Sequence, residues 1–242
     1  MENYKITSEG HLGSGTYGSV EKIQLTNLLG NQCHPVGYAM KTLINVQNDP
    51  DLIKRFIREL KSQDACLHKH VVQIFLCNLS ANPPWFVMEL AECSLYKELQ
   101  SVELSITKKI NIINMVLKGV AYIHSKGYLH RDIKPENILR FPGEIYKVTD
   151  FGFAKHSDPS NSQFATKVGL FHGTPKYFDW DVMANGYSNQ SDIYSLGVLL
   201  EDLYFDGLDE IIAKCKHKKL NKRFYNVEQI LNAVNALEVK KK

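Results

Sequence analysis

The sequence predicts an α+β fold in which a strand-rich first half precedes a helix-rich second half. Two patterns predict it: apolar and polar side chains alternate in several runs up to about residue 90, and from residue 105 onward apolar residues recur at helical spacing. The chain has 242 residues, 44% of them hydrophobic and 23% charged, which suffices for one large domain or for two lobes that share a cleft. Disordered, collagen-like and coiled-coil proteins are excluded by the same composition.

The first half is expected to form a five-stranded antiparallel sheet and one helix. Strands are predicted before a glycine-rich turn at residues 13–18 and at residues 20–25, 38–43, 71–77 and 85–90. Between the third and fourth strands, Asp49 is an N-cap candidate and Pro50 suits the first helical position. The residues that recur on one face of this helix are Leu52, Phe56, Glu59 and Gln63.

Helices are expected to dominate the second half. The first long one follows Ser105, and the residues on its apolar face are Ile106, Ile110, Ile113, Leu117, Val120 and His124. The boundary between the two halves therefore falls near residue 91, with no linker rich in Pro, Gly or Ser.

Charge, hydropathy and cysteine spacing exclude several classes of protein. The net charge of +3, from 29 Lys and Arg against 26 Asp and Glu, gives no reason to expect a nucleic-acid partner. Neither a bilayer-spanning apolar run nor a signal peptide is recognisable, so we expect a cytoplasmic protein without a membrane partner. No CxxC pair occurs, which predicts reduced packing residues at Cys33, Cys66, Cys77, Cys93 and Cys215.

Residues 13–20 form a GxGxxGxV segment. A Rossmann turn shares its first six positions but runs from a strand into a helix, whereas the alternation after Val20 predicts a second strand. A glycine-rich turn between two strands lets backbone N–H groups approach phosphate oxygens, because no Cβ obstructs them. The segment therefore predicts a phosphate-covering loop, with an ordinary glycine turn as the alternative.

Lys41 is the first candidate for a charged contact to that phosphate. It lies on a predicted strand, 18 residues before Glu59 on the predicted helix. A lone strand lysine is usually a solvated edge residue. Next to a phosphate-covering loop, however, a cation oriented by a helical glutamate is what holding the α- and β-phosphates requires.

Two further motifs carry a family resemblance. Residues 130–137 read His-Arg-Asp-Ile-Lys-Pro-Glu-Asn, and Asp150-Phe151-Gly152 follows 13 residues after Asn137. Together with the glycine segment and Lys41, these motifs resemble the eukaryotic-type (Hanks-type) protein kinases, and of these the serine/threonine branch. The resemblance implies a protein-kinase-like two-lobed fold in a single domain over residues 1–242. Its N-lobe would span about 1–90, its hinge 89–93 and its reduced, mainly helical C-lobe about 94–237.

The resemblance implies a role for each polar residue of these motifs. Asp132 would orient the substrate hydroxyl and accept its proton, and Lys134 would contact the γ-phosphate. Asn137 and Asp150 would bind Mg²⁺ through oxygen ligands. The expected catalytic set is completed by Lys41, Glu59 and Thr174, the last in a Gly-Thr-Pro-x-Tyr segment that, with Lys134, favours Ser/Thr over Tyr substrates.

The same resemblance implies an ATP site. Met88 takes the gatekeeper position, Glu89 to Ala91 form the hinge that would bond adenine, and Asp192 would brace the backbone of residues 130–131. The residues expected to bind ATP are Leu12, Gly13, Ser14, Gly15, Thr16, Tyr17, Gly18, Ser19, Val20, Ala39, Lys41, Met88, Glu89, Ala91 and Leu139.

Four departures from the family pattern accompany the resemblance. The usual Ala-Pro-Glu is Asp179-Trp180-Asp181, so the ion pair that anchors this segment would join Asp181 to Arg223. Gln63 replaces an apolar residue, which either weakens the active alignment or finds a polar partner. An activation-loop switch has the candidate sites Thr166, Ser162, Ser160 and Ser157, or none.

The fourth departure is a missing insertion after the helix that ends near Tyr204, where the family has a substrate-docking helix. Instead, a short helix is predicted with Leu208, Ile211, Ile212 and Cys215 on one face. The lysines between residues 214 and 222 would then line an exposed surface. It would be either a solvated surface or the docking site of an acidic partner over Lys214 to Arg223.

The function predicted from these residues is transfer of the γ-phosphate of Mg-ATP to protein Ser/Thr hydroxyls, with autophosphorylation. A nucleotide-binding pseudokinase that acts as a scaffold is the alternative, and a small-molecule kinase is a third. Glu92, Glu98 and Glu136 suggest a preference for basic substrates.

Overall fold

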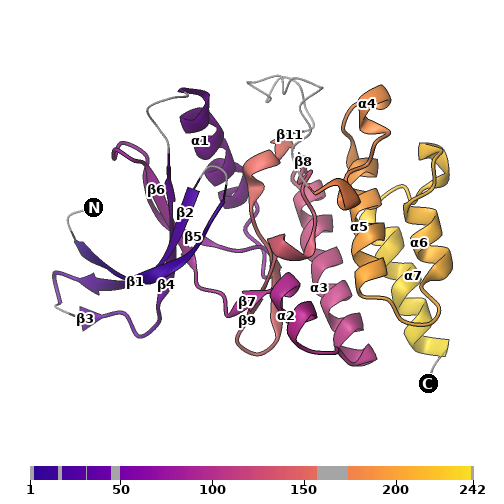
Figure 1. The fold of residues 1–242 in the computed structure, drawn as a ribbon, viewed down its shortest axis with the longest axis horizontal. Helices are drawn as coiled ribbons and strands as arrows, with labels where there is room; N and C mark the ends of the chain where they lie inside the picture. The colour runs from indigo at the N-terminus through magenta and orange to yellow at the C-terminus, as the bar shows by residue number, and fades with distance from the viewer. Residues whose placement is uncertain (1–2, 16–17, 31, 45–49, 157–173, 241–242) are drawn as a thin grey trace.

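The first half of the chain forms an antiparallel sheet (Figure 1). The computed structural model describes residues 3–15, 18–30, 32–44, 50–156 and 174–240. The sheet order is β1-β2-β4-β6-β5, with strands β1 (Tyr4–Ser14), β2 (Gly18–Asn27), β4 (Tyr38–Leu43), β5 (Ile74–Asn78) and β6 (Trp85–Glu89). The five predicted strands are confirmed, and β3 (Gln32–Cys33) pairs with the end of β2 as a sixth. A strand of two residues is too short to show an alternating pattern.

One helix, α1 (Pro50–Asp64), packs against this sheet through the predicted face. The ring centroids of Phe56 and Phe86 lie 5.1 Å apart, and Leu60 belongs to the same apolar cluster. Glu59 and Gln63 are buried as well, at 5% and 2% exposure. The helix therefore carries two polar side chains into the interior, where each needs a polar partner.

The second half is mainly helical and packs around α3 (Ile106–Ser125). Ile113, Leu117 and Val120 are buried as predicted. Ile106 is 51% exposed, so its predicted burial is wrong, because the packed face begins one turn later at Ile110. The other helices are α2 (Leu95–Ser101), α4 (Val182–Asn185), α5 (Asn189–Asp202), α6 (Asp209–Cys215) and α7 (Val227–Lys240). None of the helices in the described ranges is both long and apolar enough to cross a membrane.

The second half of the chain also contains short strands and single helical turns (Figure 1). The strands are β7 (Cys93–Ser94), β8 (Tyr128–Leu129), β9 (Ile138–Phe141), β10 (Ile145–Val148) and β11 (Lys155–His156). The 3-10 turns are η2 (Pro135–Asn137), η3 (Phe151–Phe153), η5 (Pro175–Tyr177) and η6 (Leu220–Lys222). Three of these turns contain or border the motifs singled out in the sequence.

Helices α5 and α6 are joined by residues 203–208 and pack closely against each other. The predicted inner face of α6 is confirmed, since Leu208, Ile211, Ile212 and Cys215 are buried. A Cβ at Gly197 of α5 would lie 2.6 Å from the Cβ of Cys215, closer than side chains approach. Gly197 therefore permits the direct contact between these two helices.

The five cysteines are free. Cys66 and Cys215 are buried, which agrees with the prediction of packing residues, and Cys77 and Cys93 are partly buried. Cys33 is exposed on the two-residue edge strand β3, so the prediction is wrong there.

Residues 70–72 join the two halves of the molecule. Val148 N–H donates to the His70 carbonyl and Val72 N–H donates to the Val148 carbonyl, both at 3.0 Å. A ring nitrogen of His70, Nδ1, lies 3.0 Å from the carbonyl oxygen of Tyr146. Burial, reinforced by the positive charges of nearby residues and only partly offset by that carbonyl, lowers the pKa of His70 to about 4.

We predict from this junction that part of the folding stability is lost as the pH falls. An unfolded histidine titrates near pH 6.5, whereas His70 in the folded chain titrates at about 4. Between these values the unfolded state binds more protons, so stability present above pH 6.5 is lost as the pH falls toward 4. We expect the His70→Gln variant to lose less stability over this range than the wild type, as measured by urea unfolding at a series of pH values. The exposed His11→Gln control should keep the wild-type slope, and an unchanged slope in His70→Gln would assign the effect to other groups.

Candidate active site

A cavity of about 320 Å³ is lined by residues of the sheet and of the second half of the chain. Its lining includes most residues expected to bind ATP: Leu12, Gly13, Gly15, Gly18, Val20, Ala39, Lys41, Met88, Glu89, Ala91 and Leu139. Glu59, Asn137 and Asp150 line the same cavity. The strands and turns thus bring together residues that lie up to 138 positions apart in the chain, from Leu12 to Asp150.

Some predicted residues lie elsewhere. The hydroxyls of Ser14 and Ser19 contact the ring nitrogens of His11 at 3.2 and 3.4 Å, and neither serine belongs to the cavity lining. Both side chains turn to this exposed histidine, and their nucleotide contact stays a prediction. Thr16 and Tyr17 lie outside the described residues, as do all four candidate phosphorylation sites, Thr166, Ser162, Ser160 and Ser157.

Lys41 is the charged centre of the cavity. Its ammonium group pairs with Glu59 Oε1 and lies 3.5 Å from Asp150 Oδ1. Burial alone would lower the pKa of Lys41, but the Asp150 and Glu59 carboxylates outweigh it and raise this pKa above its ordinary value. Lys41 is therefore a permanent cation, and α1 presents Glu59 to it from the buried face.

Asp150 is held by its own backbone turn. Its φ of 63° is left-handed, and its carboxylate accepts a hydrogen bond from Gly152 N–H at 3.3 Å. Phe151 is fully buried against the ring of His130, and Arg55 of α1 donates to the Gly152 carbonyl at 3.0 Å. Burial would raise the pKa of Asp150, yet Lys41, His130 and the Gly152 amide together lower it, so the carboxylate is ionised.

Asp132, Lys134 and Asn137 form a compact polar group beside the cavity. The Asn137 side-chain amide donates to the Asp132 carbonyl and to Asp132 Oδ2, both at 2.8 Å. Lys134 Nζ lies 3.0 Å from Asp132 Oδ2. One carboxylate oxygen of Asp132 is thus engaged by two donors. This arrangement fixes the side chain of Asp132 beside the ammonium group of Lys134.

The loop that carries Asp132 is held by Asp192 of α5. Asp192 is fully buried and accepts hydrogen bonds from the backbone N–H groups of His130 and Arg131, both at 2.8 Å. His124 Nε2 lies 2.8 Å from the same carboxylate. Arg131 has a left-handed φ of 70°, which is costly for a residue with a side chain. The predicted bracing contact is therefore present and holds a strained turn.

The donor set of the cavity suits a hard divalent cation. The side-chain NH₂ group of Asn137 donates to Asp132, which leaves Oδ1 of Asn137 as an acceptor. The Asp150 side chain is 39% exposed. In the described part of the chain, no three His, Cys, Asp or Glu side chains form a ready metal cage. Mg²⁺ is commonly bound by one or two protein oxygens together with substrate phosphates, so these two residues fit it.

The structure shows the partners of two residues that depart from the family pattern, Gln63 and Asp181. The amide of Gln63 donates to the Val72 carbonyl at 3.0 Å, so the second of its two predicted outcomes, a polar partner, is the one observed. The expected Asp181–Arg223 ion pair is confirmed at 2.8 Å. Arg223 also pairs with Asp179, a partner that the sequence analysis did not assign to it.

Two predictions about charged residues, one on the acidic cleft and one on the basic stretch, are wrong in part. Glu98 is buried and bonded to Arg140 Nη1 at 2.8 Å and to the Tyr146 hydroxyl at 2.7 Å, so it cannot attract basic substrates as predicted. Within the stretch predicted to be an exposed basic surface, Lys216 is partly buried and pairs with Glu201 at 2.5 Å. Glu92 and Glu136 do line the cavity.

Thr174 is the remaining member of the predicted catalytic set. Thr174 is partly buried, its carbonyl accepts the Tyr177 N–H at 3.0 Å, and its predicted catalytic role stays a prediction. Leu90 and Cys93 of the predicted hinge line the cavity, and so do Ser94, Lys97 and Thr149, which the sequence analysis did not assign to the site. Proximity to the predicted hinge could have indicated Ser94 and Lys97.

Comparisons with known proteins agree with this geometry. A family model described as the protein kinase domain matches residues 6–240. The chain is 31% identical over 210 residues to a mitogen-activated protein kinase kinase, mkk2, of Aspergillus fumigatus, covering 82% of this chain and 39% of that protein. It is 31% identical over 226 residues to the probable serine/threonine-protein kinase PknB of Lactococcus lactis, covering 89% and 34%.

A third relative is named as a tyrosine-protein kinase. The chain is 30% identical over 201 residues to the tyrosine-protein kinase FRK of Homo sapiens, covering 79% of this chain and 37% of that protein. The chain thus spans less than half the length of each of these three relatives.

The fold and the cavity define a two-lobed protein with an ion-paired lysine, an anchored aspartate turn and a separate Asp-Lys-Asn group. The chain belongs to the protein kinase domain family. The resemblance to Hanks-type kinases drawn from the sequence is thereby confirmed. No catalytic position predicted from the family pattern is substituted in the sequence, and the pseudokinase alternative gains no support from these matches.

Proposed function

We propose that this chain transfers the γ-phosphoryl group of ATP to serine or threonine hydroxyls of protein substrates. The observation that carries the proposal is that Lys41, Asp150 and Asn137 line one cavity while Asp132 adjoins it through its bonds to Asn137. The substrate oxygen would bond to the γ-phosphorus as the bond to the β,γ-bridging oxygen breaks, releasing ADP. The hydroxyl proton would pass to Asp132.

Each charged residue has a part in this proposal. Lys41, oriented by Glu59, would hold the α- and β-phosphates, and Lys134 would stabilise negative charge on the transferring group. Asn137 and Asp150 would hold Mg²⁺, which when bound neutralises phosphate charge and orients the phosphates. The apolar walls formed by Val20, Ala39 and Leu139 would enclose the adenine ring.

The test is incorporation of labelled phosphate from ATP into a generic protein substrate by the purified chain, with Mg²⁺ present. We expect label in the wild type and less than about one hundredth of it in Lys41→Met, since the phosphate-binding cation is lost. The matched control is Lys22→Met, which removes an exposed lysine from the adjoining strand β2. Equal labelling by wild type and Lys41→Met would contradict the proposal.

The labelled products also test which residue type is phosphorylated and whether the kinase phosphorylates itself. Acid hydrolysis of the labelled substrate separates phosphoserine and phosphothreonine from phosphotyrosine, and we expect the first two. Peptide mapping of the labelled kinase by mass spectrometry tests autophosphorylation on Thr166, Ser162, Ser160 or Ser157. Exclusive phosphotyrosine would overturn the Ser/Thr preference while leaving the transfer reaction standing.

Two further expectations concern a binding partner and the cellular compartment. We expect an acidic partner to dock on the exposed lysines of the basic stretch, Lys214, Lys218, Lys219 and Lys222. We also expect the chain to act in the cytoplasm, where ATP is plentiful and free thiols such as Cys33 stay reduced.

A further inference from the structure

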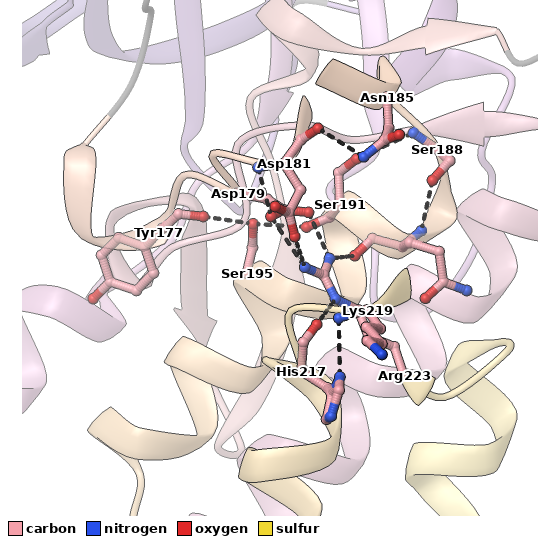
Figure 2. Close-up of polar contacts among 11 residues, drawn as sticks. Tyr177, Asp179, Asp181, Asn185, Ser188, Ser191, Ser195, His217, Lys219 and Arg223 are labelled. Carbon is pink, nitrogen blue, oxygen red and sulfur yellow. Dashed lines mark hydrogen bonds and ion pairs between the residues drawn. The ribbon is translucent and has the colours of Figure 1, made fainter. Parts of the chain in front are cut away.

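Arg223 is a buried cation whose three nitrogens are all engaged (Figure 2). Its side chain is 1% exposed. Nε donates to the His217 carbonyl at 2.7 Å, and Nη1 donates to the Gln190 carbonyl at 3.0 Å. The remaining contacts go to the two aspartates of residues 179–181. One guanidinium therefore ties the start of α5 and the loop after α6 to that segment.

The two aspartates contribute unequally. Asp179 accepts at both oxygens, with Oδ2 to Nη1 at 2.5 Å and Oδ1 to Nη2 at 3.2 Å, whereas Asp181 accepts once, at 2.8 Å. The side chain of Asp179 is 4% exposed and that of Asp181 is 39% exposed. Charged hydrogen bonds are strongest where water is excluded and where the carboxylate binds both arms of the guanidinium. Asp179 is thus the stronger partner of Arg223.

Asp179 stands at the end of a segment that is fastened at two other points. The Tyr177 carbonyl accepts a hydrogen bond from Ser195 Oγ at 2.8 Å, as Figure 2 shows. The Tyr177 hydroxyl donates to Asp202 Oδ2 at 2.5 Å. Ser195 and Asp202 both belong to α5, whereas the Arg223 contact joins this segment to the loop after α6.

We propose that Asp179 is the positioning residue that holds residues 174–181 against the helical lobe through Arg223, with Asp181 as the weaker second partner. Its role in peptide binding rests on the proposed function, to which we add the expectation that residues 174–181 support the protein substrate. Asp179 touches no substrate itself. It acts by fixing the backbone between Tyr177 and α4.

The first experiment compares Asp179→Asn with Asp181→Asn, since the same change is made two residues apart. We expect Asp179→Asn to raise the KM for a peptide substrate about tenfold or more and to leave the KM for ATP within about twofold. Asp181→Asn should change the peptide KM by less than about threefold. An equal or larger effect of Asp181→Asn, or a parallel rise in the KM for ATP in Asp179→Asn, would overturn the proposal.

The second experiment needs no catalysis. The backbone amides of Tyr177, Phe178 and Val182 donate within the segment, at 3.0, 3.3 and 3.1 Å. Hydrogen exchange of a peptide spanning 174–182 should be faster in Asp179→Asn than in Asp181→Asn, and equal rates would contradict the proposal. A wild type that exchanges as expected but transfers no phosphate would refute the kinase proposal and leave this one intact.

A second pair of variants covers the case in which Asp179→Asn does not fold. Asp179→Glu and Asp181→Glu keep the charge and lengthen each side chain by one methylene. Because Asp179 is enclosed and Asp181 is partly exposed, we expect faster exchange of the 174–182 peptide in Asp179→Glu. Faster exchange in Asp181→Glu would assign the anchor to Asp181 instead.

Discussion

An Asp132→Asn variant should lose phosphoryl transfer by a factor of about 10² to 10⁴ while keeping its affinity for nucleotide. Asparagine has the same shape and retains one oxygen that can accept the Asn137 amide, which donates at 2.8 Å in the wild type. It has no carboxylate to accept the hydroxyl proton. It also removes the negative partner of Lys134, whose Nζ lies 3.0 Å from Asp132 Oδ2.

The expected signature is a fall in kcat with little change in the KM for ATP. Asp132 lies outside the cavity lining, whereas Lys41 and the hinge residues lie within it, so nucleotide binding is independent of the substituted group. Label incorporation at saturating ATP gives kcat, and titration with a fluorescent ATP analogue gives affinity without turnover. Both should be measured with Mg²⁺ present.

The matched control is Asp51→Asn, at a residue of α1 whose side chain is 80% exposed. It makes the same chemical change far from the polar group of Asp132, and we expect kcat within about twofold of the wild type. If Asp132→Asn retained the wild-type kcat, the assignment of Asp132 as the proton acceptor would fail. A loss of nucleotide affinity equal to the loss of kcat would instead show that the substitution disturbs the cavity.

Much of the site could be predicted because its residues lie in short, ordered motifs. The spacing of Lys41 and Glu59 on a strand and a helix was enough to predict their ion pair, and the pair is present. Asp192 was expected to brace residues 130–131, and it does so through two backbone bonds. In each case a partner could be assigned from the sequence, by spacing for Lys41 and by the family resemblance for Asp192.

Predictions were incomplete or wrong where several partners compete for one group. Arg223 has enough donors for two carboxylates, and a position-by-position comparison with the family pattern assigned it Asp181, which is present, but not Asp179. Glu98 was expected at the cleft, yet Arg140, Tyr146 and Lys108 draw it inside. Such choices depend on burial and on residues distant in the chain, which neither spacing nor periodicity reveals.

An Asp192→Asn variant should lose about 3–5 kcal/mol of unfolding free energy, because one side of a buried, charged hydrogen-bond network is removed. The wild-type carboxylate faces three nitrogens: the backbone N–H groups of His130 and Arg131, and Nε2 of His124, each at 2.8 Å. Asparagine presents one oxygen and one NH₂ group, so its amide would turn donors toward N–H groups that are themselves donors. At 0% exposure no water can replace the lost acceptor.

The same substitution should impair catalysis even in molecules that remain folded. Arg131 holds a left-handed φ of 70°, and its N–H bond to Asp192 stabilises that turn immediately before Asp132. Urea unfolding gives the loss of stability, and kcat measured well below the unfolding midpoint gives the loss of alignment. Asp51→Asn, at an exposed aspartate, should change neither. A stability loss below about 1 kcal/mol would mean that the loop keeps its shape without Asp192, and the strained turn at Arg131 would then need another support.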